Sequence, residues 1–159
     1  MIKDILIANH QDVSIYLTQD IPDFIDIEEY ADFYNDLYYA ESEYKPNNFH
    51  TYCMVAKIDN EIVGTASFQI SRIIPCNRTY LFRDFVKPQY RGRGIYKLLF
   101  KERLNYIREI LHSKLTEVAT ASTVVENIIK EYGFIENGLE VQFDMKEGLI
   151  TSKKFYCVL

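Results

Sequence analysis

The chain has 159 residues, of which 48% are hydrophobic and 26% are charged, and its formal net charge is −5. This length favours a single domain over residues 1–159, and the hydrophobic content excludes an intrinsically disordered chain. No run of 18 apolar residues is present and the N-terminus is a poor signal peptide, so we expect a cytoplasmic protein without a membrane span. The three cysteines are scattered with no C-x-x-C pair, which argues against a disulfide framework and against a metal site.

The charged residues are segregated along the chain. Residues 19–44 contain no lysine or arginine but nine acids, which are Asp20, Asp23, Asp26, Glu28, Glu29, Asp32, Asp36, Glu41 and Glu43. Residues 72–103 contain nine of the 18 basic residues and only two acids, Asp84 and Glu102. The first region favours cationic partners and the second favours anionic ones, although solvated helix faces also produce such patterns.

The first third of the chain predicts a strand and a helix. Residues 2–7 are expected to form a short strand. Asp26-Ile27-Glu28-Glu29 has the spacing of a capping box, and apolar and aromatic residues recur at helical intervals from there to Tyr38. The helix is expected to end before the turn-rich Lys45-Pro46-Asn47-Asn48.

The middle of the chain predicts three strands. Residues 51–58 and 61–70 are two strand-like runs joined by Asp59-Asn60, which indicates a β-hairpin. Residues 75–77 are expected to form a loop, and residues 79–86 the next strand.

The last part of the chain alternates helices and strands. Apolar spacing predicts a long helix from Gly94 to Leu111, followed by a strand over residues 117–121. Thr123-Val124-Val125-Glu126 has a second capping-box spacing. The helix that it opens is expected to bury Val124, Val125, Ile128, Ile129 and Tyr132. Gly133 suits a left-handed residue after that helix, and residues 139–145 and 152–158 are strand-like. This order of elements predicts an α/β (α+β) domain with one central sheet.

The segment around Arg91-Gly92-Arg93-Gly94 is the most informative about function. A strand ends before Pro88, this glycine turn follows, and a helix begins. The main-chain N–H groups and the positive end of the helix dipole at such a junction bind phosphate or pyrophosphate. Lys97 stands where the third glycine of a dinucleotide fingerprint would fall, and the P-loop pattern is also absent. A nucleic-acid-binding domain is disfavoured, because the net charge is negative and the basic stretch is single.

Residues 86–96, Val-Lys-Pro-Gln-Tyr-Arg-Gly-Arg-Gly-Ile-Tyr, resemble the acetyl-CoA-binding motif of the GNAT superfamily of N-acetyltransferases. Gln89, Gly92 and Gly94 fill the three fixed positions of that motif. The order of the elements is similar over most of the chain, including Gly133-Phe134 after the second C-terminal helix. The resemblance implies a mixed, mostly antiparallel central sheet of six to seven strands flanked by about four helices.

The resemblance also implies an activity and a cofactor site. The protein would transfer acetyl from acetyl-CoA to a primary amine by direct attack, without a metal. The main chain of Phe85 and Val86 would pair with the pantetheine arm. The main-chain amides of six residues would hold the pyrophosphate, namely Arg91, Gly92, Arg93, Gly94, Ile95 and Tyr96. Homodimers occur in the family, so a homodimer is compatible with the resemblance.

The catalytic residues of the family are matched less well. Family members often carry a tyrosine, four residues before the glycine, that protonates the departing thiolate, and an asparagine seven residues earlier. Here these positions are Ile129 and Ser122. Asp84, on the motif strand, is the first candidate for a base. The alternatives are an ion pair with Arg83 or Arg91, or a carboxylate that faces the edge of the sheet. Ser122 and Tyr132 are further catalytic candidates, and the alternatives are a capping hydroxyl and a packing tyrosine.

The family places its acceptor site around the first helices, which here are the acidic and tyrosine-rich region. Asp32, Asp36 and Tyr34 are candidates for binding a cationic amine, because carboxylates and aromatic faces both attract cations. The alternative is an amphipathic helix with packed tyrosines and solvated acids. A second function also stays open, an acyl-CoA-binding sensor or interaction module with little or no turnover, because the usual tyrosine is missing.

Overall fold

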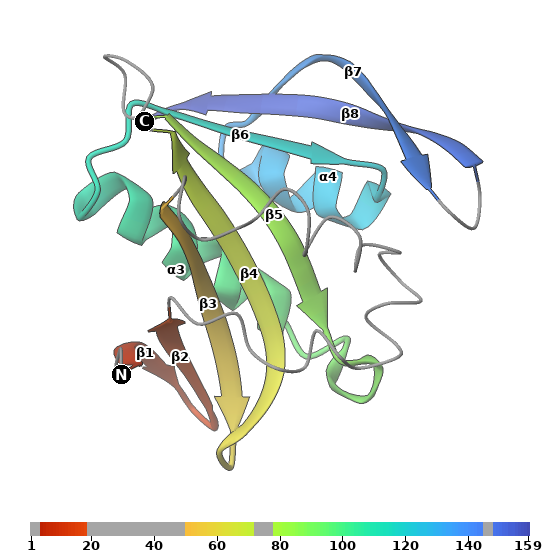
Figure 1. The fold of residues 1–159 in the computed structure, drawn as a ribbon. Coiled ribbons are helices and arrows are strands. Elements are labelled where there is room, and N and C mark those ends of the chain that lie inside the picture. The colour runs from red at the N-terminus through yellow and green to blue at the C-terminus, as the bar shows by residue number, and fades with distance from the viewer. Residues whose placement is uncertain (1–3, 19–49, 72–77, 145–147) are drawn as a thin grey trace.

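The computed structural model of the chain describes residues 4–18, 50–71, 78–144 and 148–159. Eight strands in this part of the chain form one sheet, in the order β1-β2-β3-β4-β5-β6-β8-β7 (Figure 1). Their bounds are Ile5–His10, Val13–Thr18, His50–Ile58, Glu61–Ser71, Arg78–Val86, Leu115–Thr120, Ile135–Asp144 and Gly148–Val158, for β1 to β8 in turn. The described helices are the short 3₁₀-helix η2 (Pro88–Tyr90), α3 (Ile95–Glu109) and α4 (Thr123–Glu131). The helix expected after Asp26 and the loops at residues 45–48 and 75–77 lie outside the described residues.

The sheet is mixed and mostly antiparallel, as expected from the sequence. Six of its seven neighbouring pairs are antiparallel, and β5 with β6 is the parallel pair. The described part of the sheet has eight strands rather than six to seven, because β1 and β2 form an N-terminal hairpin. The sequence prediction placed a single strand at residues 2–7 and missed β2. The alternation of Val13, Ile15 and Leu17, all buried, was the available signal.

The hairpin of β3 and β4 is confirmed. Asp59 and Asn60 connect the two strands, with φ angles of 49° and 66°. Two consecutive residues with positive φ make the twisted two-residue turn that best suits a hairpin, and aspartate and asparagine tolerate this conformation better than other non-glycine residues. The sequence Asp-Asn therefore replaces the more usual Asn-Gly.

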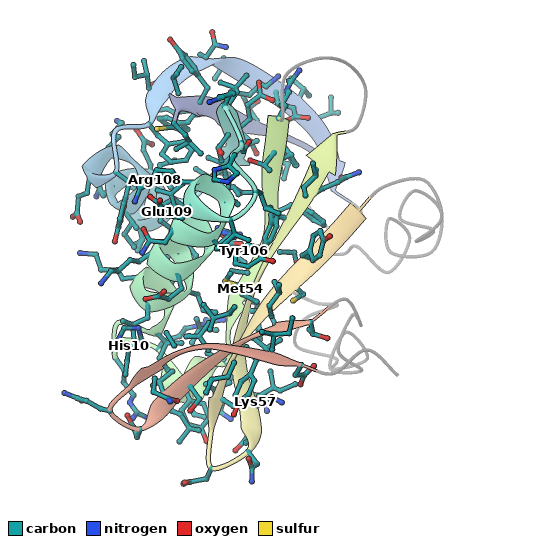
Figure 2. All side chains as sticks on the ribbon, turned by 90° about the vertical axis from the view of Figure 1, so that its left-hand side faces the viewer. His10, Met54, Lys57, Tyr106, Arg108 and Glu109 are labelled. Carbon is teal, nitrogen blue, oxygen red and sulfur yellow. The ribbon has the colours of Figure 1, made fainter. Side chains whose placement is uncertain are left out.

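Helix α3 lies against one face of the sheet (Figure 2). It buries six side chains, which are Ile95, Leu99, Phe100, Arg103, Leu104 and Ile107. The sheet contributes Met54, Ala66 and Phe68 to the same core. Five of the six helical residues are apolar and recur at helical spacing, so burial of this face is the main reason that the segment is helical.

The N-cap of helix α4 lies one residue before the predicted N-cap. Its N-cap is Ser122, whose Oγ accepts a hydrogen bond from the Val125 amide at 3.4 Å, rather than Thr123. Val124 is consequently at the second helical position and is 69% exposed, so its predicted burial was wrong. Ile128 and Ile129 are buried as expected, and Gly133 has the predicted left-handed conformation, with φ of 87°.

Strands β7 and β8 form a hairpin that is longer than the two strands predicted. Their register shifts between Glu136 and Leu139, where Gly138 has φ of 106°. A β-bulge at this point lets β7 bend while its pairing with β8 continues. No helix within the described ranges has both the length and the apolar character needed to cross a lipid bilayer.

Candidate functional site

The candidate site begins where two neighbouring parallel strands separate. The register of β5 with β6 runs from Arg78 beside Leu115 to Leu81 beside Val118, whereas β5 continues next to β4 as far as Val86. Figure 1 shows β5 and β6 starting side by side and diverging toward their C-terminal ends. We call residues 82–86 the diverging segment of β5.

A β-bulge lies at the start of this divergence. Ser67 of β4 pairs with Phe82 and Thr65 pairs with Phe85, so β5 carries one more residue than β4 over this interval. An extra residue bends a strand and increases its local twist. The bulge therefore accounts for the path of β5 away from β6, and it places Asp84 within the bend.

The glycine turn, residues 91–94, follows β5 and opens α3. Gly92 and Gly94 both have left-handed conformations, with φ of 74° and 76°. The Arg91 amide donates to the Pro88 carbonyl at 3.2 Å, and the first helical bond runs from the Leu98 amide to the Gly94 carbonyl at 3.1 Å. The positive end of the α3 dipole thus lies at Gly94 and Ile95, and no acid occupies the first turn of the helix.

The space beside the two glycines suits an anionic group. A Cβ atom added at Gly92 or at Gly94 would meet no heavy atom within 4 Å. Glycine is thus required here by the positive φ rather than by crowding within the protein. Without a Cβ at these two positions, the turn can bring main-chain N–H groups close to phosphate oxygens.

Ion pairs surround the glycine turn. Within the described part of the chain, these pairs are Arg93–Asp12 at 2.7 Å, Lys87–Glu61 at 2.8 Å and Lys97–Glu131 at 3.1 Å. Glu61 also accepts a hydrogen bond from the Tyr90 hydroxyl at 2.9 Å. The hydrogen bonds from Lys87 and Tyr90 lower the pKa of the Glu61 carboxyl. An anion that binds at the turn would therefore compete with acids of the protein for these cations.

Arg91 points back toward the end of β5. Its Nε donates to the Val86 carbonyl at 2.8 Å, and its guanidinium lies 5.6 Å from the centre of the Phe85 ring. This arginine covers the junction between the diverging segment and the turn.

Asp84 forms a hydrogen-bonded ion pair with Arg103 of α3. Arg103 donates to its two carboxylate oxygens at 2.5 and 2.8 Å, and the Tyr96 hydroxyl donates to Oδ2 at 2.8 Å. The ion-pair alternative therefore holds for Asp84. Its partner, however, is Arg103 rather than either residue expected from sequence. Arg91 contacts the Val86 carbonyl instead. The side chain of Arg83 is not among the described ones.

Arg103 is the polar residue of this region that sequence reasoning missed. Its side chain has 0% exposure, and it donates a further hydrogen bond to the Ser67 carbonyl at 2.7 Å. Burial alone would lower the pKa of the guanidinium, but the charge and hydrogen bonds of Asp84 outweigh burial and raise it. Arg103 is therefore charged. The sequence did contain a signal for this burial, because Arg103 lies four residues from both Leu99 and Ile107, which are buried on the same face of α3.

Comparison with known proteins gives the family. A family model described as an acetyltransferase (GNAT) domain matches residues 18–147. The chain belongs to the GNAT family of acetyltransferases. The resemblance noticed in residues 86–96 is thereby confirmed at the level of the family.

Solved structures of GNAT proteins share the fold. A probable acetyltransferase from Staphylococcus epidermidis has a TM-score of 0.72 at 16% identity, with 92% of this chain and 98% of that chain covered. Mutant forms of the spermidine/spermine N-acetyltransferase of Vibrio cholerae have a TM-score of 0.70 at 16% identity, with coverage of 94% and 95%. A GNAT family acetyltransferase from Elizabethkingia anophelis with acetyl-CoA bound has a TM-score of 0.62 at 17% identity, with coverage of 94% and 100%.

The GNAT catalytic candidates do not form one cluster. Ser122 caps α4, the Tyr132 ring packs 5.1 Å from the Phe100 ring, and no hydrogen bond within the described residues joins either one to Asp84. Ile129, at the position of the usual GNAT tyrosine, has 0% exposure and belongs to the hydrophobic core. The aliphatic side chain is thus part of the packing, and it brings no hydroxyl to this position.

The remaining site predictions have different outcomes. Gln89 lies exposed in η2, and Phe85 and Val86 are buried at the end of β5. Asp32, Tyr34 and Asp36 lie outside the described residues. Among the residues that are described, no group of three or more histidine, cysteine, aspartate or glutamate side chains could hold a metal ion.

Proposed function

We propose that this GNAT protein transfers acetyl from acetyl-CoA to a primary amine, and that the acceptor is a small cationic molecule. One observation carries the proposal. The glycine turn opens α3 directly after the diverging segment of β5, so an anion-binding helix terminus lies next to a separated pair of strands. A ligand with a pyrophosphate and an amide-containing arm matches both parts.

Acetyl-CoA would be held mainly by main chain. The amides of Gly92, Gly94 and Ile95 would face the pyrophosphate, because they lie at the positive end of α3. The main chain of Phe85 and Val86 would pair with the pantetheine amides in the manner of an added strand. Arg93 would gain a phosphate contact if its bond to Asp12 were released.

The proposed reaction is direct attack by the amine nitrogen. An alkylammonium with a pKa of about 10.4 has no lone pair, so the acceptor must first lose a proton to a base or to water. The neutral amine then attacks the thioester carbonyl carbon and a C–N bond forms. The C–S bond breaks with its electron pair on sulfur, and the nitrogen loses a second proton to water or to the departing thiolate. The CoA thiol has an ordinary pKa of about 8.5, so the thiolate can depart without a strong acid. A base role for Asp84 stays a prediction, and its three hydrogen bonds favour water as the proton acceptor.

The acceptor class is supported by the acidic region at residues 19–44. Nine acids without a compensating lysine or arginine would attract a polycation. The similar Vibrio cholerae enzyme is, by its name, a spermidine/spermine N-acetyltransferase. We expect that Asp32→Asn and Asp36→Asn raise the KM for a polyamine and leave the KM for acetyl-CoA unchanged. An unchanged polyamine KM would remove these residues from the acceptor site.

A second candidate function is acyl-CoA binding without turnover. The observation that favours it is the buried Ile129, which leaves the usual hydroxyl donor absent from that position. Such a protein would act as a sensor or an interaction module.

An assay of CoA release distinguishes the two functions. Acetyl-CoA is incubated with the protein and with polyamines, aminoglycosides, amino acids or peptides, and free thiol is measured. Binding of acetyl-CoA is measured separately by calorimetry. Release with one class of amine supports the transferase, whereas tight binding without release across the panel supports the binding module. Absence of binding would refute both proposals.

A further inference from the structure

We propose that Arg103, Asp84 and Tyr96 form a positioning network that fixes the glycine turn relative to the diverging segment of β5. The proposal rests on the proposed function, because its purpose is to hold the two halves of an acyl-CoA site at a set separation. Two of these side chains come from α3 and the third comes from β5. None of them needs to contact the reacting atoms, so all three are positioning residues.

The network begins at the β-bulge. Arg103 donates to the Ser67 carbonyl of β4 at 2.7 Å and to both Asp84 oxygens at 2.5 and 2.8 Å. One guanidinium thus bridges the two strands at the point where their register shifts. The side chain is fully buried, and hydrogen bonds between charged groups are both stronger and more directional in such surroundings. Arg103 therefore holds the bend that separates β5 from β6.

The network continues to the start of α3. The Tyr96 hydroxyl donates to Asp84 Oδ2 at 2.8 Å, and the Tyr96 ring lies 6.2 Å from the Phe100 ring. Tyr96 is the second residue of α3 and comes two positions after Gly94. Its side chain therefore links the first turn of the helix to the middle of the diverging segment, two regions that are 12 residues apart in sequence.

The direction of this hydrogen bond assigns a positioning role to Tyr96 rather than that of an acid. The Tyr96 hydroxyl donates its proton to Asp84 Oδ2 within the protein. Proton delivery from Tyr96 to a thiolate would break this bond. The bond instead serves to hold the helix terminus in place.

A fixed separation matters only for a ligand that contacts both regions. CoA would bind the glycine turn through its pyrophosphate and the diverging segment through its pantetheine. Binding of the second half is effectively intramolecular, and its contribution depends on how well the two regions are pre-arranged. A fragment that ends at the diphosphate contacts the turn alone and gains nothing from the network.

The test compares Tyr96→Phe with Tyr106→Phe. Both changes remove one hydroxyl from a half-buried tyrosine of α3. Tyr106 packs near Phe68, and among the described residues the side-chain partners of Asp84 are Tyr96 and Arg103, not Tyr106. Tyr96→Phe leaves both Asp84 oxygens bonded to Arg103, so the protein is expected to fold. Dissociation constants are measured for CoA and for adenosine 3′-phosphate 5′-diphosphate, which lacks the pantetheine arm. Thermal unfolding is recorded for each variant.

We expect Tyr96→Phe to weaken CoA binding about tenfold, because the glycine turn and the diverging segment are then no longer held at the separation that CoA bridges. Binding of the diphosphate fragment should stay within about twofold of the wild type, and Tyr106→Phe should change neither constant. A merely structural role would weaken CoA and the fragment equally, and this result would overturn the network. Unchanged CoA binding by Tyr96→Phe would overturn it as well. If the wild-type protein fails to bind CoA, the proposed function itself is refuted and the network falls with it.

Discussion

Replacement of Gly94 by alanine tests the glycine turn most directly. Gly94 is the N-cap of α3 and has φ of 76°. An alanine Cβ would meet no heavy atom within 4 Å, so the substitution causes no steric clash with the rest of the protein. The substitution acts on the backbone alone, because residues with a Cβ rarely adopt a positive φ.

The expected magnitude has two parts. A residue with a Cβ in the left-handed region costs about 1–2 kcal/mol of folding free energy, which the whole protein loses. The turn can relieve this cost by moving to negative φ, which turns the amides of the helix terminus away from the anion. Loss of one charged hydrogen bond of about 1.5–3 kcal/mol weakens CoA binding about tenfold to a hundredfold.

Gly133→Ala is the matched control. Gly133 follows α4, has φ of 87°, and likewise has no heavy atom within 4 Å of an added Cβ. Thermal unfolding and CoA calorimetry are run on both variants. Their losses of stability should be similar, whereas only Gly94→Ala should lose CoA affinity. Equal CoA affinities of the two variants would refute the assignment of residues 91–94 as the pyrophosphate site.

Two further predictions concern the ion pairs around the turn. Asp12→Asn releases Arg93 and should strengthen CoA binding about twofold at low salt, an effect that vanishes at high salt. Glu109→Gln, which breaks an exposed pair elsewhere on α3, should leave CoA binding unchanged at any salt concentration. The pKa of Glu61 is lowered by hydrogen bonds from Lys87 and Tyr90, so its stabilising effect is present above its ordinary pKa of about 4.3 and is lost as the pH falls through the folded value. As the pH falls below about 4.3, the thermal midpoint of Glu61→Gln should therefore fall less than the thermal midpoint of the wild type. Parallel pH profiles of the two midpoints would contradict the pairing of Glu61 with Lys87 and Tyr90.

The sequence predicted the elements whose signals are local. The Asp59-Asn60 hairpin, the helix after Gly94 and the left-handed Gly133 all depend on nearby residues, and each is found in the structure. The cap of α4 was misplaced by one residue, because Ser122 and Thr123 are both good capping residues and only the structure distinguishes them.

The contacts of the site could not be predicted in the same way. Asp84 was recognised as important, but its partner Arg103 lies 19 residues away and on another element. Nearest-neighbour reasoning pointed to Arg83 and Arg91, which are closer in sequence. The partner depends on how α3 packs across the β-bulge, and that geometry arises from the whole sheet rather than from any short pattern.

The place of β8 in the sheet has a consequence for how the protein folds during synthesis. Strand β8, Gly148–Val158, follows β7 in sequence, yet it lies between β6 and β7 in the sheet. The ribosome must therefore release β8 before β7 can join the sheet. Until then β6 presents one edge without its neighbour, and such edges promote association between chains. The match to the family ends at residue 147, so a protein shortened to that boundary would keep the glycine turn and lose the strand that completes the sheet.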